Sequence, residues 1–159
     1  MKIPTSLMHK PVIVSENYER VDGRSANHSD AKGLSLGLTQ CNDREKVDVS
    51  AQVWRYTEEK GAGQSEELPL HRVLDLTLLV CRSMLHFRES YRYQDLYDPE
   101  NPVVDRIGLQ GDAMTVAVCT ENDNIKEDIK RFNQALSDND ELMGERLRAL
   151  SRILKDMGY

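Results

Sequence analysis

The sequence predicts an α+β fold that is mostly helical, with a long central helix packed on a small antiparallel sheet and a C-terminal helix hairpin. Three observations predict it. Residues 66–93 are the longest stretch of the chain with helical periodicity, and residues 47–56 alternate with the period of a strand. Residues 124–157 contain two segments in which apolar side chains recur at helical spacing. Because 159 residues fit one core and no composition shift divides them, we expect a single domain over 1–159.

The N-terminal part predicts one strand and one helix. Residues 11–15 form a short apolar segment behind a proline, which is typical of an edge strand. Residues 27–40 predict a short capped helix with apolar side chains at i, i+3 and i+7 (Ala31, Leu34, Leu38). Gly33 and Gly37 weaken that helix by about 1 kcal/mol each relative to alanine. We therefore expect another element to pack closely on the two glycines.

Three further segments predict strands. Residues 47–56 carry valine and alanine on one side and polar residues on the other, and the single tryptophan, Trp54, falls on the polar side. This placement indicates either packing under the following loop or exposure for a partner. Residues 103–109 and 113–120 are rich in β-formers and are separated by a turn. With residues 11–15 at an edge, we expect these segments to make one antiparallel sheet.

The central helix is expected to run without interruption over residues 66–93. Ser65 can cap its start, and Pro69 is tolerated in the first turn of a helix. The apolar arc is wider than a surface helix requires, which places the helix in the middle of the fold. Two shorter helices, residues 124–136 and 141–157, then form the terminal hairpin.

One face of the central helix carries the first candidate site, consisting of His71, Asp75, Arg82 and His86. At about 100° per residue these side chains fall close together, and the i,i+4 pairs can touch. The functional interpretation is a polar cleft in which a carboxylate orients an imidazole and an arginine binds an anion. The alternative is a solvated face with weak ion pairs, which is the commoner outcome for charged helix faces.

A second candidate site lies in the loop before the predicted N-terminal helix, at Arg24, Asn27, His28 and Asp30. Loops on a rigid scaffold concentrate binding residues, and the N-terminus of a helix attracts anions. Asp30 partly cancels that field. An ordinary capped loop is the alternative interpretation.

The sequence contains no recognisable catalytic, nucleotide-binding or metal-binding motif. Its three cysteines are far apart and lack zinc-ligand spacing, so we expect reduced thiols, no metal and no cofactor. The net charge of −6 disfavours binding to a nucleic-acid backbone and suits a basic protein partner. No apolar run approaches the roughly 20 residues that span a bilayer, and no signal peptide is recognised, so we expect no membrane contact and a cytoplasmic, soluble, acidic protein.

Three blocks of sequence together resemble a family of short bacterial proteins of unassigned function. They are KPVIVSENYERVDGRSANHSDAKGLSLGLTQ, ELPLHRVLDLTLLVCRSMLHFR and DPENPVVDRIGLQGDAMTV. The resemblance covers most of the chain. It implies a bacterial, cytoplasmic, single-domain protein, and it implies no activity and no functional residues.

Two functions follow as hypotheses. The first is a non-enzymatic binding or regulatory protein that acts through protein contacts, either with a protein partner or as a homodimer. The acidic balance, the lack of a catalytic motif and the unusual position of Trp54 favour it. The alternative is a small enzyme of the hydrolase or lyase type that uses the His/Asp/Arg cleft on the central helix.

Overall fold

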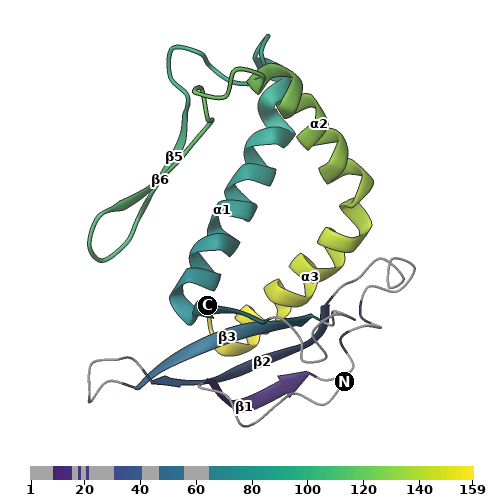
Figure 1. Ribbon diagram of the computed structural model, residues 1–159. Coiled ribbons are helices and arrows are strands. Elements are labelled where there is room, and N and C mark those ends of the chain that lie inside the picture. The colour runs from purple at the N-terminus through teal and green to yellow at the C-terminus, as the bar shows by residue number, and fades with distance from the viewer. Residues whose placement is uncertain (1–8, 16–17, 19–20, 22–30, 41–46, 56–64) are drawn as a thin grey trace. The chain divides into compact units, whose positions relative to one another are not determined.

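The computed structural model describes residues 9–15, 18, 21, 31–40, 47–55 and 65–159 (Figure 1). The chain divides into two compact units, Met1–Leu76 and Thr77–Tyr159, which are described separately below. The boundary lies inside one continuous helix. A single domain over the whole chain and the packing of the central helix on a sheet therefore stay predictions.

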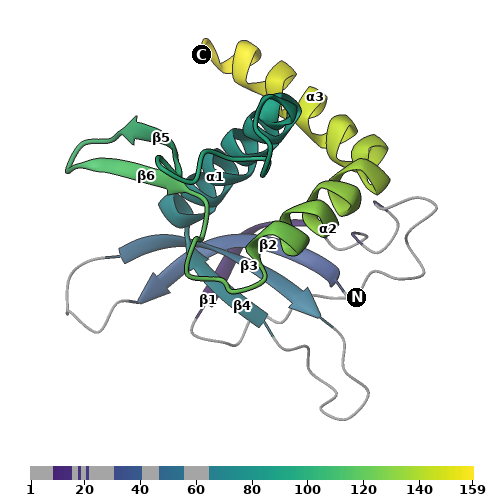
Figure 2. The same ribbon diagram turned by 90° about the horizontal axis from the view of Figure 1, so that it is seen from above.

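The first unit contains a four-stranded antiparallel sheet in the order β1-β2-β3-β4. The strands are β1 (His9–Ser15), β2 (Ala31–Gln40), β3 (Val47–Arg55) and β4 (Ser65–Pro69). Each strand pairs with the one before it in the chain, so the sheet is a simple meander, which Figure 2 shows from above. The predictions of strands at 11–15 and 47–56 are confirmed.

The predicted helix over residues 27–40 is wrong, because Ala31–Gln40 is strand β2. The segment satisfies a helical stripe, but it also alternates small residues with leucines at period two. Two glycines weaken a helix there, and pairing with a neighbour on each side stabilises the strand. Gly33 and Gly37 are buried in the sheet.

The two faces of the sheet differ in chemistry. On β2 and β3, the face that we call the serine face is buried and consists of Gly33, Ser35, Gly37, Ser50, Gln52 and Trp54. The opposite face, the leucine face, is defined by cross-strand partners on all four strands: Ile13, Leu34, Leu36, Leu38, Val49, Ala51, Val53 and Leu68. Its most exposed large side chains range from 38% exposed for Leu36 to 63% for Ile13.

Trp54 anchors the serine face. Its side chain is 0% exposed, and its indole Nε1–H donates a hydrogen bond to Ser35 Oγ at 2.9 Å. Gly33 is the direct cross-strand partner of Trp54, and a residue without a side chain at this position leaves room for the indole. Nearby on the same face, the Ser50 hydroxyl donates to Glu67 Oε1 at 2.6 Å. The side of β3 that looked polar in sequence is therefore the buried side.

The central helix α1 spans Leu70–Glu89, which is shorter than the predicted 66–93. At its start, Ser65–Pro69 is strand β4, so Ser65 does not cap the helix. At its end, the backbone tightens into a 3-10 turn, η3 (Ser90–Arg92), in which the Ser90 hydroxyl donates to the Phe87 carbonyl at 3.0 Å. Between these limits the helix is continuous, as predicted.

Strands β5 (Val103–Gly108) and β6 (Ala113–Ala117) form a separate two-stranded antiparallel sheet in the second unit. Both strands were predicted, but their membership of one sheet with residues 47–56 is wrong. Their connection, residues 109–112, favours a local hairpin, and a hairpin with a short loop pairs with itself at little entropic cost.

Helices α2 (Ile125–Asp138) and α3 (Asp140–Met157) confirm the two predicted C-terminal helices. Only Asn139 separates them, and both views show a bend between the helices (Figures 1 and 2). A helix hairpin needs a loop of about two to five residues to turn back on itself, so the predicted C-terminal hairpin is not formed. The description "mostly helical" is also wrong, because six strands accompany the three α-helices of the described residues, although the α+β class holds.

Candidate functional site

The polar face predicted on the central helix is only partly assembled. Arg82 and His86 line a common cavity in the second unit, together with Glu89, which the helical period also places on this face. His71 is exposed, and Asp75 forms an ion pair with Arg72 instead, at 3.3 Å from Nη1 to Oδ2. The predicted pairing of His71 with Asp75 is therefore absent among the described residues.

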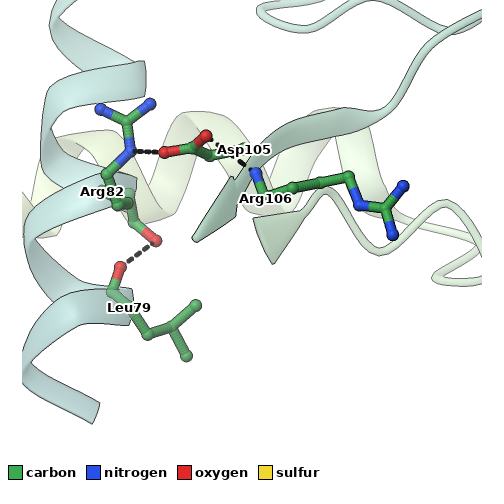
Figure 3. A network of polar contacts seen from close by, with 5 residues as sticks. Leu79, Arg82, Asp105 and Arg106 are labelled. Atoms are coloured by element: carbon green, nitrogen blue, oxygen red, sulfur yellow. Dashed lines mark hydrogen bonds and ion pairs between the residues drawn. The ribbon is translucent and has the colours of Figure 1, made fainter. Parts of the chain in front are cut away.

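Arg82 is held by the β5–β6 hairpin. Its Nε lies 2.5 Å from Asp105 Oδ2, and the other carboxylate oxygen of Asp105 accepts a hydrogen bond from the backbone N–H of Arg106 at 2.8 Å. Figure 3 shows the two terminal nitrogens of Arg82 clear of this carboxylate. Within the described chain, Asp105 is the only side chain that pairs with Arg82. The guanidinium is thus oriented through one nitrogen while its outer donors stay free for another acceptor.

The cavity beside Arg82 is polar and has a volume of about 250 Å³. Arg92 borders it from η3, and its Nη1 lies 3.9 Å from Glu89 Oε2, a distance at the limit of an ion pair. Both of these side chains are about three-fifths exposed. The complete lining is Arg82, Leu85, His86, Glu89, Arg92, Tyr93 and Val104, and we call this cavity the arginine pocket.

A second cavity of about 230 Å³ shares His86 and Val104 with the arginine pocket. It is apolar, and the rings of Phe87 and Phe132 lie in its lining with centroids 5.4 Å apart. Helix α1, the β5–β6 hairpin and helix α2 supply its walls. We call it the phenylalanine pocket; it is lined by Ser83, His86, Phe87, Val104, Val116, Ala117, Val118, Cys119, Ile125, Asp128, Ile129 and Phe132.

His86 lines both pockets, and its environment bears on the enzyme hypothesis. Its Nε2 is shielded from solvent and has no hydrogen-bond partner among the described residues. Asp128, which also lines the phenylalanine pocket, accepts a hydrogen bond from Asn122 at 2.9 Å rather than one from His86. In the part of the chain that the structure describes, no side chain therefore orients the imidazole through Nε2 as the acid of a catalytic triad would.

The other predicted site, Arg24, Asn27, His28 and Asp30, lies outside the described residues. Among the residues that are described, no three side chains of the His, Cys, Asp or Glu type are grouped so as to hold a metal ion. No helix in the same part of the chain is long and apolar enough to cross a membrane.

Sequence reasoning missed Asp105, Arg92 and the phenylalanine pocket. Asp105 lies 23 positions after Arg82, and nothing in a local pattern indicates that a hairpin returns to the helix there. Glu89 lies three positions after His86, so the helical period by itself predicts that the polar face extends toward the C-terminal end of α1.

The leucine face of the first unit is the other candidate surface. Ile13, Leu36, Ala51 and Leu68 form one apolar row across all four strands, and the rows on either side of it on β2 and β3 are also aliphatic. At one end of this face, Arg55 Nη1 pairs with Glu66 Oε1 at 2.5 Å. An uncharged centre with a charged rim is the usual anatomy of a protein contact surface.

The comparisons give a family but no activity. The model of a family described as "Family of unknown function (DUF6530)" matches residues 1–159. Neither the curated proteins nor the solved structures gave a match.

Proposed function

Since the chain belongs to this family of unknown function, no activity comes to it from a relative, and we propose from its surfaces that it is a non-enzymatic binding protein that acts through protein contacts. The observation that supports the proposal is the leucine face, where five large side chains are 38–63% exposed in one contiguous patch: Ile13, Leu36, Leu38, Val49 and Leu68. Soluble proteins rarely leave such a patch uncovered unless it binds something.

We take the occupant of the leucine face to be a second copy of this chain. The face is aliphatic, so two copies can stack as two sheets do in a sandwich, about 10 Å apart. A two-fold contact also sets Arg55 and Glu66 of one copy against the same rim in its partner, because the same patch is used on both sides.

The charge distribution favours contact through this unit. Residues 1–76 contain 10 Lys and Arg and 12 Asp and Glu, which gives −2 of the net −6, whereas residues 77–159 contain 11 and 15. Repulsion between identical copies is therefore weaker at the first unit than at the second.

The test is the oligomeric state of the purified full chain and of the variants Leu36→Asp and Leu38→Asp. Light scattering and sedimentation should show a dimer for the natural chain and a monomer for both variants, because a buried unpaired carboxylate is costly. Leu109→Asp is the matched control, since Leu109 is 46% exposed in the β5–β6 turn and lies outside the face, and it should remain dimeric.

Circular dichroism and the emission of Trp54 establish that each variant is folded. A natural chain that stays monomeric up to about 1 mM, where an association worth about 4 kcal/mol would be half complete, overturns the proposal. So does a dimer that both face variants leave intact. A stoichiometric complex with a different protein, lost in Leu36→Asp, would keep the function and replace the occupant.

A further inference from the structure

The arginine pocket and the phenylalanine pocket offer two kinds of chemistry side by side. One is bordered by Arg82 and Arg92, and the other by the rings of Phe87 and Phe132. Because His86 and Val104 line both, the two cavities adjoin each other within the second unit. Small-molecule sites commonly combine an apolar cavity with a few convergent polar groups.

Arg82 is pre-oriented to receive an anion. The ion pair between its Nε and Asp105 restrains the guanidinium, so less side-chain entropy remains to be lost when a ligand binds to the outer nitrogens (Figure 3). The side chain is 31% exposed, so those nitrogens are accessible at the wall of the arginine pocket and are partly shielded from bulk water. Partial shielding strengthens a charge-assisted hydrogen bond.

The charges around the pocket set the charge of the ligand. Asp105 balances Arg82, and Glu89 balances Arg92, so the four groups sum to zero. A dianion such as a phosphate monoester would face two carboxylates with no net positive charge to hold it. A carboxylate carries one charge and matches the fork of a guanidinium, and the 3.9 Å separation of Arg92 from Glu89 leaves Arg92 able to turn toward it.

The phenylalanine pocket sets the rest of the ligand. Its volume of about 230 Å³ equals that of about eight water molecules at roughly 30 Å³ each, enough for a short aliphatic chain or one ring. Its walls are aliphatic and aromatic apart from Ser83, His86, Cys119 and Asp128. Burial of apolar ligand atoms there is favourable by the hydrophobic effect.

We propose that these two pockets form one binding site for a small monocarboxylate with an apolar tail. The carboxylate binds the outer nitrogens of Arg82 and approaches Arg92, and the tail lies against Phe87 and Phe132. This site is independent of the leucine face, since all its residues belong to the second unit.

Octanoate is the probe, and titration calorimetry of the full chain at neutral pH is the measurement. Saturable binding with a Kd below about 1 mM is expected. Octanamide has the same tail without the charge, acetate has the charge without the tail, and inorganic phosphate tests the preference for a single charge. Each of these three should bind at least about tenfold more weakly than octanoate, because each loses one of the two kinds of contact or meets the carboxylates.

Variants assign the binding to this site. Arg82→Gln should weaken octanoate about tenfold or more and leave octanamide unchanged, since a hydrogen bond to a charged group is lost. Ala117→Leu fills the phenylalanine pocket and should weaken both ligands, whereas Thr115→Leu, on the same strand but outside the pocket lining, should weaken neither. Arg92→Gln is the second charge variant in case Arg82→Gln does not fold.

The proposal is overturned if octanoate fails to saturate, if octanamide binds equally well, or if no arginine variant changes the affinity. Leu36→Asp separates this proposal from the preceding one. Octanoate binding that survives in that variant supports the site, and binding that disappears there assigns the octanoate to the leucine face and refutes it.

Discussion

The hydrogen bond between Trp54 and Ser35 makes a sharp prediction about stability. Ser35→Ala removes the acceptor of the indole N–H while leaving the indole, which is 0% exposed, in place. A buried donor without a partner costs about 1–3 kcal/mol. For a chain of 159 residues each kcal/mol corresponds to about 2–4 °C, so the melting temperature of the full chain should fall by about 2–12 °C.

A double-mutant cycle isolates the contribution of the hydrogen bond. Trp54→Phe removes the donor, so Ser35→Ala made in the Trp54→Phe background no longer leaves an N–H unpaired. The second substitution should then cost at least about 1 kcal/mol less than it does alone. Urea unfolding followed by circular dichroism gives all four free energies of unfolding, and tryptophan emission gives an independent value for the two proteins that keep the single tryptophan of the sequence.

The cycle also defines the refuting result. If Ser35→Ala costs the same free energy of unfolding in both backgrounds, the indole and the hydroxyl are not coupled. The buried hydrogen bond between Trp54 and Ser35 on the serine face is then refuted. A strongly red-shifted emission of the natural chain would contradict it as well, because such emission belongs to an indole in water.

Three further predictions concern the second unit. Asp105→Asn should loosen the β5–β6 hairpin by about 1 kcal/mol or less, since the pair with Arg82 is partly exposed, and faster amide exchange in the hairpin measures it. The pKa of Lys126 is raised above its ordinary value of 10.5 by a hydrogen bond from its ammonium to Asp95 and by the charge of that carboxylate. The resulting stability is present below pH 10.5 and is lost as the pH rises through the raised pKa; side-chain NMR titration should show the pKa fall back in Asp95→Asn. Gly158→Ala should cost about 1–2 kcal/mol at the end of α3, because φ is 93° there, and amide exchange of the last turn that stays unchanged would contradict it.

The elements that were predicted well from the sequence are those whose apolar pattern fits only one period, either that of a helix or that of a strand. Residues 47–56 alternate strictly, and the helices near 124–136 and 141–157 repeat apolar side chains over several turns, so local pattern decides them. The prediction for β2 was wrong because its residues fit both the helical and the strand period, and pairing with β1 and β3 stabilises the strand. Strand β4 was not predicted because Ser65 and Pro69 are also typical of a helix start. Its pairing with β3 depends on residues about 15 positions away, which a local pattern does not include.

The candidate site shows the same limit. The helical period brought Arg82 and His86 to one face, and the structure keeps them together at one cavity. The period could not indicate that Asp75 pairs with Arg72 or that Asp105 returns from the hairpin to hold Arg82. Contacts within a helix follow from spacing, whereas contacts between elements depend on the fold.

In the meander, the buried side of β2 and β3 carries hydroxyls and glycines, whereas leucines lie on the more exposed side. This is the reverse of the usual distribution of polar and apolar side chains. Side chains alternate every residue along a strand, so a slip of β2 by a single position would turn the leucines inward and bring Ser35 away from the indole. The hydrophobic effect alone would stabilise the shifted register, because it would bury the leucines. Trp54 and Gly33, its cross-strand partner, therefore specify the register of β2 against β3. A sheet without the tryptophan should lose its unique register before it loses its strands.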